Sequence, residues 1–297
     1  MSKVHEIVLQ KILQQMEKGE IPWIKGWANN PPINYVTRKP YTGINVLLLS
    51  KGGEYLTFRQ IQQLGGRIKK GVKAEIVVFF KPYTKIVEEV DPETGEVVEK
   101  EKESLVLRYY HVFHLSDTEG IPSKLKKIEH NPLQEAEKII AGYKDAPKIV
   151  HNNPNKAYYN AVKDLINIPD KGLFYDIHEY YSTLFHEIIH STGHPKRLNR
   201  FKWNESDIFG SETYSLEELV AEIGAAMLCQ YAGISEMTIK NSTAYIQAWL
   251  KQLQNNKSWI FTAAGRVQKA VNYILGVQTE EEPFKEEMEE ALCAYYR

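Results

Sequence analysis

A stretch near the middle of the chain, residues 178–193, constrains the fold more than any other. Apolar side chains recur there at helical spacing, at Tyr181, Leu184 and Ile188, and Gly193 follows them. This pattern predicts a helix that buries one face and ends near residue 193.

Two histidines lie on that predicted helix. His186 and His190 are one turn apart and therefore project side by side. Two imidazoles at this spacing can bind one Zn²⁺ with bonds of about 2.0–2.1 Å. Glu187 lies beside them, where its carboxylate can take a proton from an activated water. An accidental match on a helix surface is the alternative, and the amphipathic context favours a metal site with Glu187 as its catalytic base.

The third ligand decides the type of site. A metzincin needs histidine at position 196, and this chain has Lys196 there. The alternative is a carboxylate from a later helix, as in thermolysin-like gluzincins, and residues 215–228 contain Glu218 and Glu222 one turn apart in apolar company. A carboxylate buried there is costly unless it is paired or binds a metal. We therefore predict Glu218 as third ligand and Glu222 as the partner of a ligand histidine, with Glu217 turned towards solvent.

The ligand types predict the metal. Two imidazoles and one carboxylate are typical of zinc, and Mn²⁺ or Co²⁺ suits the same donors. The small residues Gly224, Ala225 and Ala226 follow Glu218 and Glu222. They predict that this helix packs closely on the histidine helix.

Composition excludes several classes of protein. No apolar run approaches the roughly 20 residues that span a bilayer, and the first twenty residues lack the continuous apolar segment of a signal peptide. We therefore expect no membrane partner. Two cysteines, Cys229 and Cys293, argue against a disulfide framework and indicate the reducing cytoplasm.

Charge is unevenly distributed along the chain, although the net charge is −1. Residues 1–86 contain 14 Lys and Arg against 5 Asp and Glu, whereas residues 87–103 contain 8 acidic residues and 2 lysines. Many aromatic residues lie among the cations of the basic segment. Aromatic faces beside cations suit the stacking of bases and the pairing of phosphates in single-stranded nucleic acid. The alternative is an ordinary small domain with an aromatic core and solvated lysines.

The first half of the chain is predicted to be mixed α/β. Residues 3–18 have the spacing of an amphipathic helix. Two β-rich runs, 74–83 and 104–117, are joined by the acidic segment and are predicted to form one long hairpin. Residues 118–133, with two prolines and many lysines, are the candidate linker.

The second half is predicted to be mostly helical with a small sheet. Two or three short strands are expected between 148 and 169, and the predicted helices are 133–143, 178–193, 215–232, 237–255, 257–275 and 280–296. A small sheet followed by helices is an α+β arrangement. The chain is long enough for two domains with a core each, and we place them at 1–130 and 131–297.

The chain resembles the ArdC-like anti-restriction proteins of plasmids and other mobile elements. The resemblance runs through NYVTRKPYTGINVLLL and TFRQIQQLGGRIKKGVKAEIVVFFK in the first half, and through FHEIIHSTGHPKRLNR and EELVAEIGAAMLC in the second. It implies an N-terminal domain that binds single-stranded DNA and a zincin-like, gluzincin-type metallopeptidase domain after it. It also implies a role in protecting incoming DNA from host restriction during conjugation. At the matching positions, His186 and His190 become metal ligands, Glu187 the general base and Glu218 the third ligand.

The resemblance does not identify the residues that contact DNA. Our candidates are Trp23, Trp27, Tyr41, Asn45, Lys81 and Arg108. The expected partners are single-stranded DNA and a protein substrate associated with DNA or with restriction. The competing hypothesis is a protein that binds and shields DNA, in which the metal site is structural or catalytically inactive.

Overall fold

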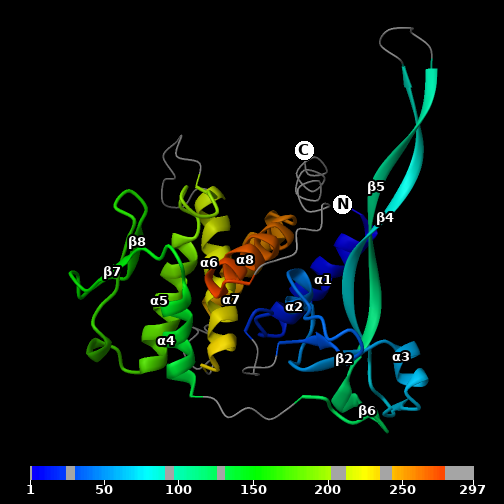
Figure 1. The fold of residues 1–297 in the computed structure, drawn as a ribbon, viewed down its shortest axis with the longest axis horizontal. Coiled ribbons are helices and arrows are strands. Elements are labelled where there is room, and N and C mark those ends of the chain that lie inside the picture. Colours follow the sequence, from blue (N-terminus) through cyan, green and yellow to red (C-terminus); the bar gives the residue numbers. More distant parts are fainter. Residues whose placement is uncertain are drawn as a thin grey trace.

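The computed structural model describes residues 2–24, 31–90, 97–125, 131–201, 212–234 and 243–277. In the described part of the chain, strands and three helices form the first half, and helices with one small sheet form the second (Figure 1). The predicted α+β class is confirmed.

Helix α1 (Lys3–Glu17) opens the fold. The Ser2 side chain caps it by accepting a hydrogen bond from the His5 amide, and Gly19 follows its C-terminus with a φ of 83°. On the predicted apolar face, Val4 and Ile7 are partly buried, and the fully buried residues are Val8, Leu9, Ile12, Leu13 and Met16. Two shorter helices follow, α2 (Ile44–Leu48) and α3 (Phe58–Gln63).

The described residues of the first half form two sheets. The larger has the strand order β1-β2-β5-β4, and the smaller pairs β3 with β6. The strands are β1 (Ile33–Asn34), β2 (Glu54–Leu56), β3 (Arg67–Ile68), β4 (Glu75–Val90), β5 (Val97–His114) and β6 (Thr118–Glu119).

Strands β4 and β5 form the predicted hairpin. Their antiparallel register runs from Glu75 opposite Val112 to Val90 opposite Val97. The hairpin is longer than the β-rich runs predicted, because pairing continues into the acidic residues. In Figure 1 the outer part of this β4–β5 ribbon stands clear of the rest of the molecule.

The second half contains a three-stranded sheet with the order β7-β9-β8, as predicted between 148 and 169. Its strands are β7 (Lys148–Val150), β8 (Tyr158–Asn160) and β9 (Leu165–Asn167). The helices are α4 (Pro132–Gly142), α5 (Ile177–Ser191), α6 (Glu212–Ala232), α7 (Thr243–Asn255) and α8 (Trp259–Leu275). The predicted helix at 280–296 lies outside the described residues.

The largest hydrophobic core takes members from both halves, whereas we expected a separate core in each. The largest cluster of buried apolar residues takes members from α1 and α2 and from α5, α6 and α8. The rings of His5 and Phe261 lie 4.8 Å apart, and those of Trp23 and Trp249 lie 6.4 Å apart. The Gln230 side chain donates a 3.1 Å hydrogen bond to the Trp23 carbonyl. The apolar face of α1 is thus buried against the C-terminal helices.

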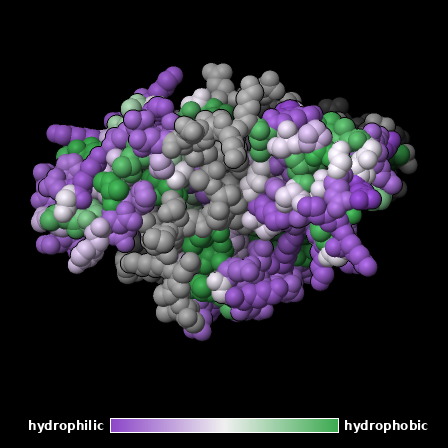
Figure 2. All heavy atoms as spheres, turned by 90° about the horizontal axis from the view of Figure 1, so that it is seen from below, coloured by the Kyte–Doolittle hydropathy of each residue, from purple (hydrophilic) through white to green (hydrophobic). Residues whose placement is uncertain are grey.

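Hydrophilic and hydrophobic residues are interspersed over the described part of the face in Figure 2. Among the described residues, no helix combines the length and the apolar composition needed to cross a bilayer.

Candidate metal centre

Close packing of α5 on α6 positions the site. A Cβ atom added to Gly224 on α6 would lie 2.6 Å from Cδ1 of Ile189 on α5, so only glycine lets the two helices approach this closely. The close packing expected from the small residues of α6 is therefore found. It places Glu218, less than two turns before Gly224, opposite the histidines of α5.

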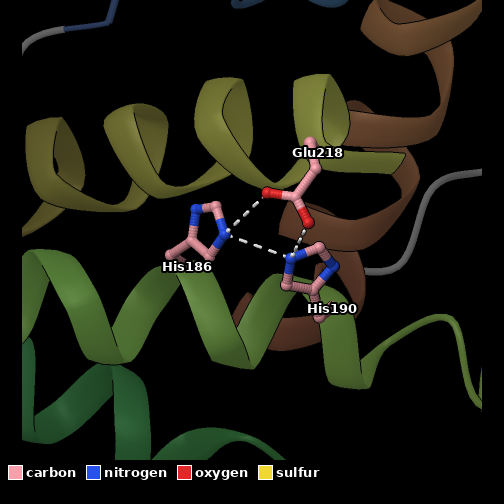
Figure 3. A group of neighbouring side chains, drawn as sticks. All are labelled: His186, His190 and Glu218. Atoms are coloured by element: carbon pink, nitrogen blue, oxygen red, sulfur yellow. Dashed lines mark hydrogen bonds and ion pairs between the residues drawn. The ribbon is translucent and has the colours of Figure 1, made fainter. Parts of the chain in front are cut away.

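His186, His190 and Glu218 meet between the two helices (Figure 3). The two Nε2 atoms of the histidines are 3.1 Å apart. The carboxylate oxygens of Glu218 lie 3.5 Å from the His186 Nε2 and 3.4 Å from the His190 Nε2. Ligand atoms around a tetrahedral ion with bonds of about 2.0–2.1 Å are about 3.3–3.4 Å apart. The spacing and the chemistry of the three donors therefore fit one divalent cation.

The electrostatics of the site favour positive charge between these groups. Burial opposes protonation of His190, but the hydrogen bonds and negative charges of Glu217 and Glu218 outweigh it and raise its pKa to about 10. Burial also opposes ionisation of Glu218, yet contacts with the two histidines hold its pKa far below the ordinary value. A cation bound to the three donors satisfies the same demand for positive charge.

Glu187 lies next to the ligands on α5, and only 8% of its surface is exposed. Burial raises the pKa of its carboxyl group, and the charges of His190 and His186 oppose that shift. The backbone N–H of Tyr159 donates a hydrogen bond to the Glu187 carboxylate. The predicted base is thus oriented by strand β8.

Glu217 occupies the role that was predicted for Glu222. Its Oε1 lies 3.6 Å from the Nδ1 of His190, and its side chain is buried rather than turned towards solvent. Arg200 holds the same carboxylate through two contacts, Nη2–Oε1 at 2.7 Å and Nε–Oε2 at 3.2 Å. The prediction that Glu217 faces solvent is therefore wrong.

Glu222 faces another helix. It lies about 6 Å further along the α6 axis than Glu218, at 1.5 Å per residue. Burial raises the pKa of Tyr245 on α7, and the nearby charge of Glu222 raises it further. The prediction that Glu222 holds a ligand histidine is therefore corrected. Glu217, which directly precedes Glu218 on α6, is the residue that contacts His190.

The loop after α5 supplies the arginine that sequence reasoning missed. A Cβ atom on Gly193 would lie 2.7 Å from Cζ of Phe201, so this glycine lets the loop fold back over the end of α5. Asn199, with a φ of 48°, turns the chain just before Arg200. The Arg200 guanidinium also donates to the Thr192 hydroxyl and the Ile189 carbonyl. The only signal in the sequence was the arginine itself in the HPKRLNR segment.

A second arginine of this loop, Arg197, ties α5 to the small sheet. Its side chain is 1% exposed and is ion-paired with Asp164. It also donates to the Ser191 carbonyl at 2.7 Å and to the Tyr159 hydroxyl at 3.0 Å. The Tyr159 hydroxyl itself donates to Asp164 at 2.8 Å, so this hydroxyl has a structural partner.

Comparison with known families agrees with both halves of the chain. Residues 2–113 match the N-terminal domain of anti-restriction factor ArdC, and residues 134–266 match the zincin-like metallopeptidase family.

Two crystal structures of the antirestriction ArdC protein from plasmid R388 are similar to this chain over both of its halves. The metal-free structure is 32% identical, covers 92% of this chain and 97% of the other, and superposes with a TM-score of 0.68. The chain belongs to the ArdC antirestriction family. The Mn(II)-bound structure of the same relative is 30% identical, covers 93% of this chain and 98% of the other, and has a TM-score of 0.69.

The chain is also similar to a DNA primase TraC of Escherichia coli and to protein y4eC of Sinorhizobium fredii. TraC is 31% identical over 294 residues, which are 92% of this chain and 27% of the primase. This chain thus spans about a quarter of the primase's length. Protein y4eC is 29% identical and covers 93% of each chain.

Three of the predicted DNA contacts are buried in this ArdC-family fold. Trp23 is 1% exposed and packs on Trp249, and Tyr41 is 7% exposed. The Asn45 side chain bonds with both the N–H and the carbonyl of Val78. These predictions are corrected, because Trp23 lies in the core that both halves share, Tyr41 lies in a smaller buried cluster, and the Asn45 side chain is bonded to β4.

The other three candidates for DNA contact are Trp27, Lys81 and Arg108. Trp27 lies outside the described residues. Lys81 and Arg108 are exposed on the β4–β5 ribbon. Their contact with DNA stays a prediction.

Proposed function

We propose that this ArdC-family chain is a metal-dependent peptidase that also binds single-stranded DNA. One observation supports the peptidase proposal above all: donors of His186, His190 and Glu218 lie 3.1–3.5 Å from one another with Glu187 beside them. Zinc suits these donors, and the Mn(II)-bound structure of the R388 relative makes Mn²⁺ the second metal to test. Such a metal supplies Lewis acidity, which polarises a peptide carbonyl and acidifies a nearby water.

Glu187 acts as the general base in this proposal. A base works best when its pKa is close to the working pH, and burial moves the pKa of Glu187 upwards in that direction. The Tyr159 N–H orients the carboxylate towards the water that attacks the peptide carbonyl.

The open edge of strand β8 is the proposed substrate-binding strand. In the sheet order β7-β9-β8, β8 is an edge strand, and no other strand in the described part of the chain pairs with its far side. The Tyr159 N–H donates to Glu187, so this edge of β8 faces the candidate centre. An extended peptide can add to such an edge through main-chain hydrogen bonds. The substrate is therefore an unfolded or extended protein segment.

The solvent exposure of the site favours catalysis over a purely structural metal. Structural zinc sites have four protein ligands, whereas catalytic sites keep one position open. Among the described residues, three donors form the cluster, and the His186 and Glu218 side chains remain 21% and 27% exposed.

A proteolysis assay tests the peptidase proposal. The full chain is loaded with Zn²⁺ or Mn²⁺ and given an unfolded protein such as reduced casein as substrate. We expect Glu187→Gln to keep the metal and to lose about 10²–10⁴-fold in rate, the usual contribution of a general base. Glu179→Gln removes another carboxylate of α5 and should have little effect. Equal proteolysis by wild type and Glu187→Gln would contradict the role of Glu187. A metal-loaded wild type without activity would support the structural alternative.

The basic first half carries the single-strand binding proposal. Residues 1–86 have 14 Lys and Arg against 5 Asp and Glu, which suits a polyanion. We propose that this affinity serves to protect incoming DNA from restriction during conjugation, and the match to an anti-restriction factor supports that role. Fluorescence anisotropy with single-stranded and duplex oligonucleotides tests it. Binding that prefers the single strand and weakens with salt is expected, and equal or absent binding contradicts it.

A further inference from the structure

We infer that one face of the β4–β5 ribbon is the surface on which the bases and phosphates of single-stranded DNA bind. This aromatic ribbon face consists of Phe79, Lys81, Tyr83, Arg108 and Tyr110. The inference rests on the single-strand binding proposed above and names the residues responsible for it. It replaces the buried candidates Trp23, Tyr41 and Asn45.

The strand register places these five residues on one side of the ribbon. Phe79 is directly opposite Arg108, and Val77 is directly opposite Tyr110. Directly opposed residues of an antiparallel pair share a face, as do residues two apart along a strand. Lys81 and Tyr83 therefore continue the face that Val77 and Phe79 begin.

The aromatic ribbon face begins where the core ends. Val77 and Val112 are 1% and 0% exposed, because they pack in a small cluster with Tyr41, Leu49 and Tyr55. From Tyr110, which lies opposite Val77, the same face is uncovered towards the outer end of the ribbon: Phe79, Tyr83 and Tyr110 are 48%, 46% and 43% exposed. Three half-exposed rings on one short stretch of a strand face are unusual for a surface without a partner.

Two exposed rings of the aromatic ribbon face contact each other, one of them also contacts a buried ring, and both are open to solvent. The ring centroids of Phe79 and Tyr110 are 6.0 Å apart, and the buried ring of Tyr41 lies 6.4 Å from Phe79. Tyr41, predicted as a base contact, thus fixes the position of an exposed ring. Preformed aromatic surfaces of this kind stack bases of any sequence, because every base has a flat aromatic face.

Cations alternate with the rings. Lys81 lies between Phe79 and Tyr83 on the same face, and Arg108 lies across from Phe79. Both side chains are exposed, and neither forms an ion pair with an acidic residue in the described part of the chain. They are available for phosphates, while Phe79 and Tyr83, about 13 Å apart along the strand, receive bases.

Two further observations favour a single strand as the occupant. The rings can stack only on bases that are not already stacked in a duplex. Beyond the aromatic ribbon face the sequence turns acidic, with 8 Asp and Glu against 2 Lys in residues 87–103. A polyanion therefore binds the inner part of the ribbon and ends near Tyr83.

Anisotropy of a labelled oligothymidylate with the full chain tests the inference. Phe79→Ala/Tyr83→Ala/Tyr110→Ala should weaken binding at least tenfold, with the salt dependence unchanged. Lys81→Ala/Arg108→Ala should also weaken it and should reduce the slope of log K against log salt by about 1.4, since each phosphate contact contributes about 0.7.

Two variants serve as matched controls. Tyr109→Ala removes a ring that is 41% exposed on the opposite face of the same strand. Lys144→Ala/Lys148→Ala removes two exposed cations from the other half of the chain. Both should bind like wild type. If wild type binds and the aromatic and cation variants bind equally well, the inference is wrong and the proposed function stands. If wild type itself fails to bind, both the inference about the ribbon and the proposed single-strand binding are wrong.

Photo-crosslinking of wild type is independent of any effect of mutation on folding. An oligonucleotide containing 5-iododeoxyuridine should crosslink to the peptides that carry Phe79, Tyr83 or Tyr110. Crosslinks confined to other peptides would overturn the inference.

Discussion

The carboxylate of Glu217 lies 3.6 Å from the Nδ1 of His190, and two nitrogens of Arg200 donate hydrogen bonds to the same carboxylate. This chain of contacts fixes the plane of the His190 ring, so that its Nε2 points at Glu218 and His186. A histidine that ligates a metal is commonly oriented in this way by a partner on its other nitrogen.

Removal of Glu217 should therefore weaken the metal site. We expect Glu217→Ala and Arg200→Ala each to lower the affinity for Zn²⁺ by about 10–100-fold, the usual cost of losing such a partner. Competition with a chromophoric chelator measures this. Glu222→Gln is the matched control on the same helix and should bind Zn²⁺ like wild type. A larger loss of Zn²⁺ affinity in Glu222→Gln than in Glu217→Ala would show that Glu222, as first predicted, is the partner of a ligand histidine.

The contact between Gly224 and Ile189 predicts a loss of stability. A methyl group at position 224 would lie 2.6 Å from the Ile189 side chain, so Gly224→Ala should destabilise the fold by about 1–3 kcal/mol. Gly265→Ala on α8 is the control, because no atom in the described part of the chain lies within 4 Å of its added Cβ. The helix preference for alanine should stabilise that variant by about 0.5–1 kcal/mol. Denaturant unfolding that gives both variants the same stability would contradict the close packing of α5 on α6.

The buried position of Trp23 predicts that its truncation affects stability and not DNA contact. Trp23→Ala should lower the free energy of unfolding by about 3–5 kcal/mol. Phe58→Ala, which truncates a ring that is 54% exposed on α3, should cost far less. At a temperature where Trp23→Ala stays folded, its affinity for single-stranded DNA should equal that of wild type. Lost affinity with unchanged stability would mean that Trp23 contacts DNA after all.

Glu54 predicts a pH dependence of stability. Its side chain is 1% exposed; burial raises its pKa, but hydrogen bonds from Ser123, Arg38 and the Lys124 amide outweigh burial and lower the pKa below its ordinary value of 4.5. Because the folded pKa is below the unfolded one, the stabilisation is complete above pH 4.5 and is lost as the pH falls through the folded pKa.

A Glu54→Gln variant isolates this contribution. It should be less stable than wild type at pH 7, and the gap should narrow as the pH falls below about 4.5. Urea unfolding at pH 7 and at pH 4 or below measures it. A gap that does not change with pH would show that Glu54 stabilises the fold by shape alone.

Much of this architecture could be predicted from local patterns. The spacing of apolar residues predicts α1 and α5, and the two β-rich runs predict the ribbon, because helix and strand periods are properties of consecutive residues. His186, Glu187 and His190 share a helix, so their juxtaposition follows from the spacing. The prediction of Glu218 as third ligand required only that an apolar helix with a buried carboxylate packs on α5.

Other features depend on tertiary contacts that no local pattern shows. Glu217 and Glu218 are adjacent, and the rotation of α6 about its axis decides which carboxylate meets which nitrogen of His190. Arg200 reaches the site only because the loop after Gly193 folds back. Trp23 and Phe79 are both aromatic residues of the basic first half, and only the packing of α1 against the C-terminal helices separates the buried ring from the exposed one.

The central claim is that His186, His190 and Glu218 bind one divalent cation. Anomalous diffraction from crystals of the full chain soaked in Zn²⁺, and separately in Mn²⁺, tests it most directly. We expect a single strong peak about 2.0–2.2 Å from the two Nε2 atoms and from a Glu218 oxygen, and no such peak in His190→Ala. A peak elsewhere, or none at full metal concentration, would contradict the claim.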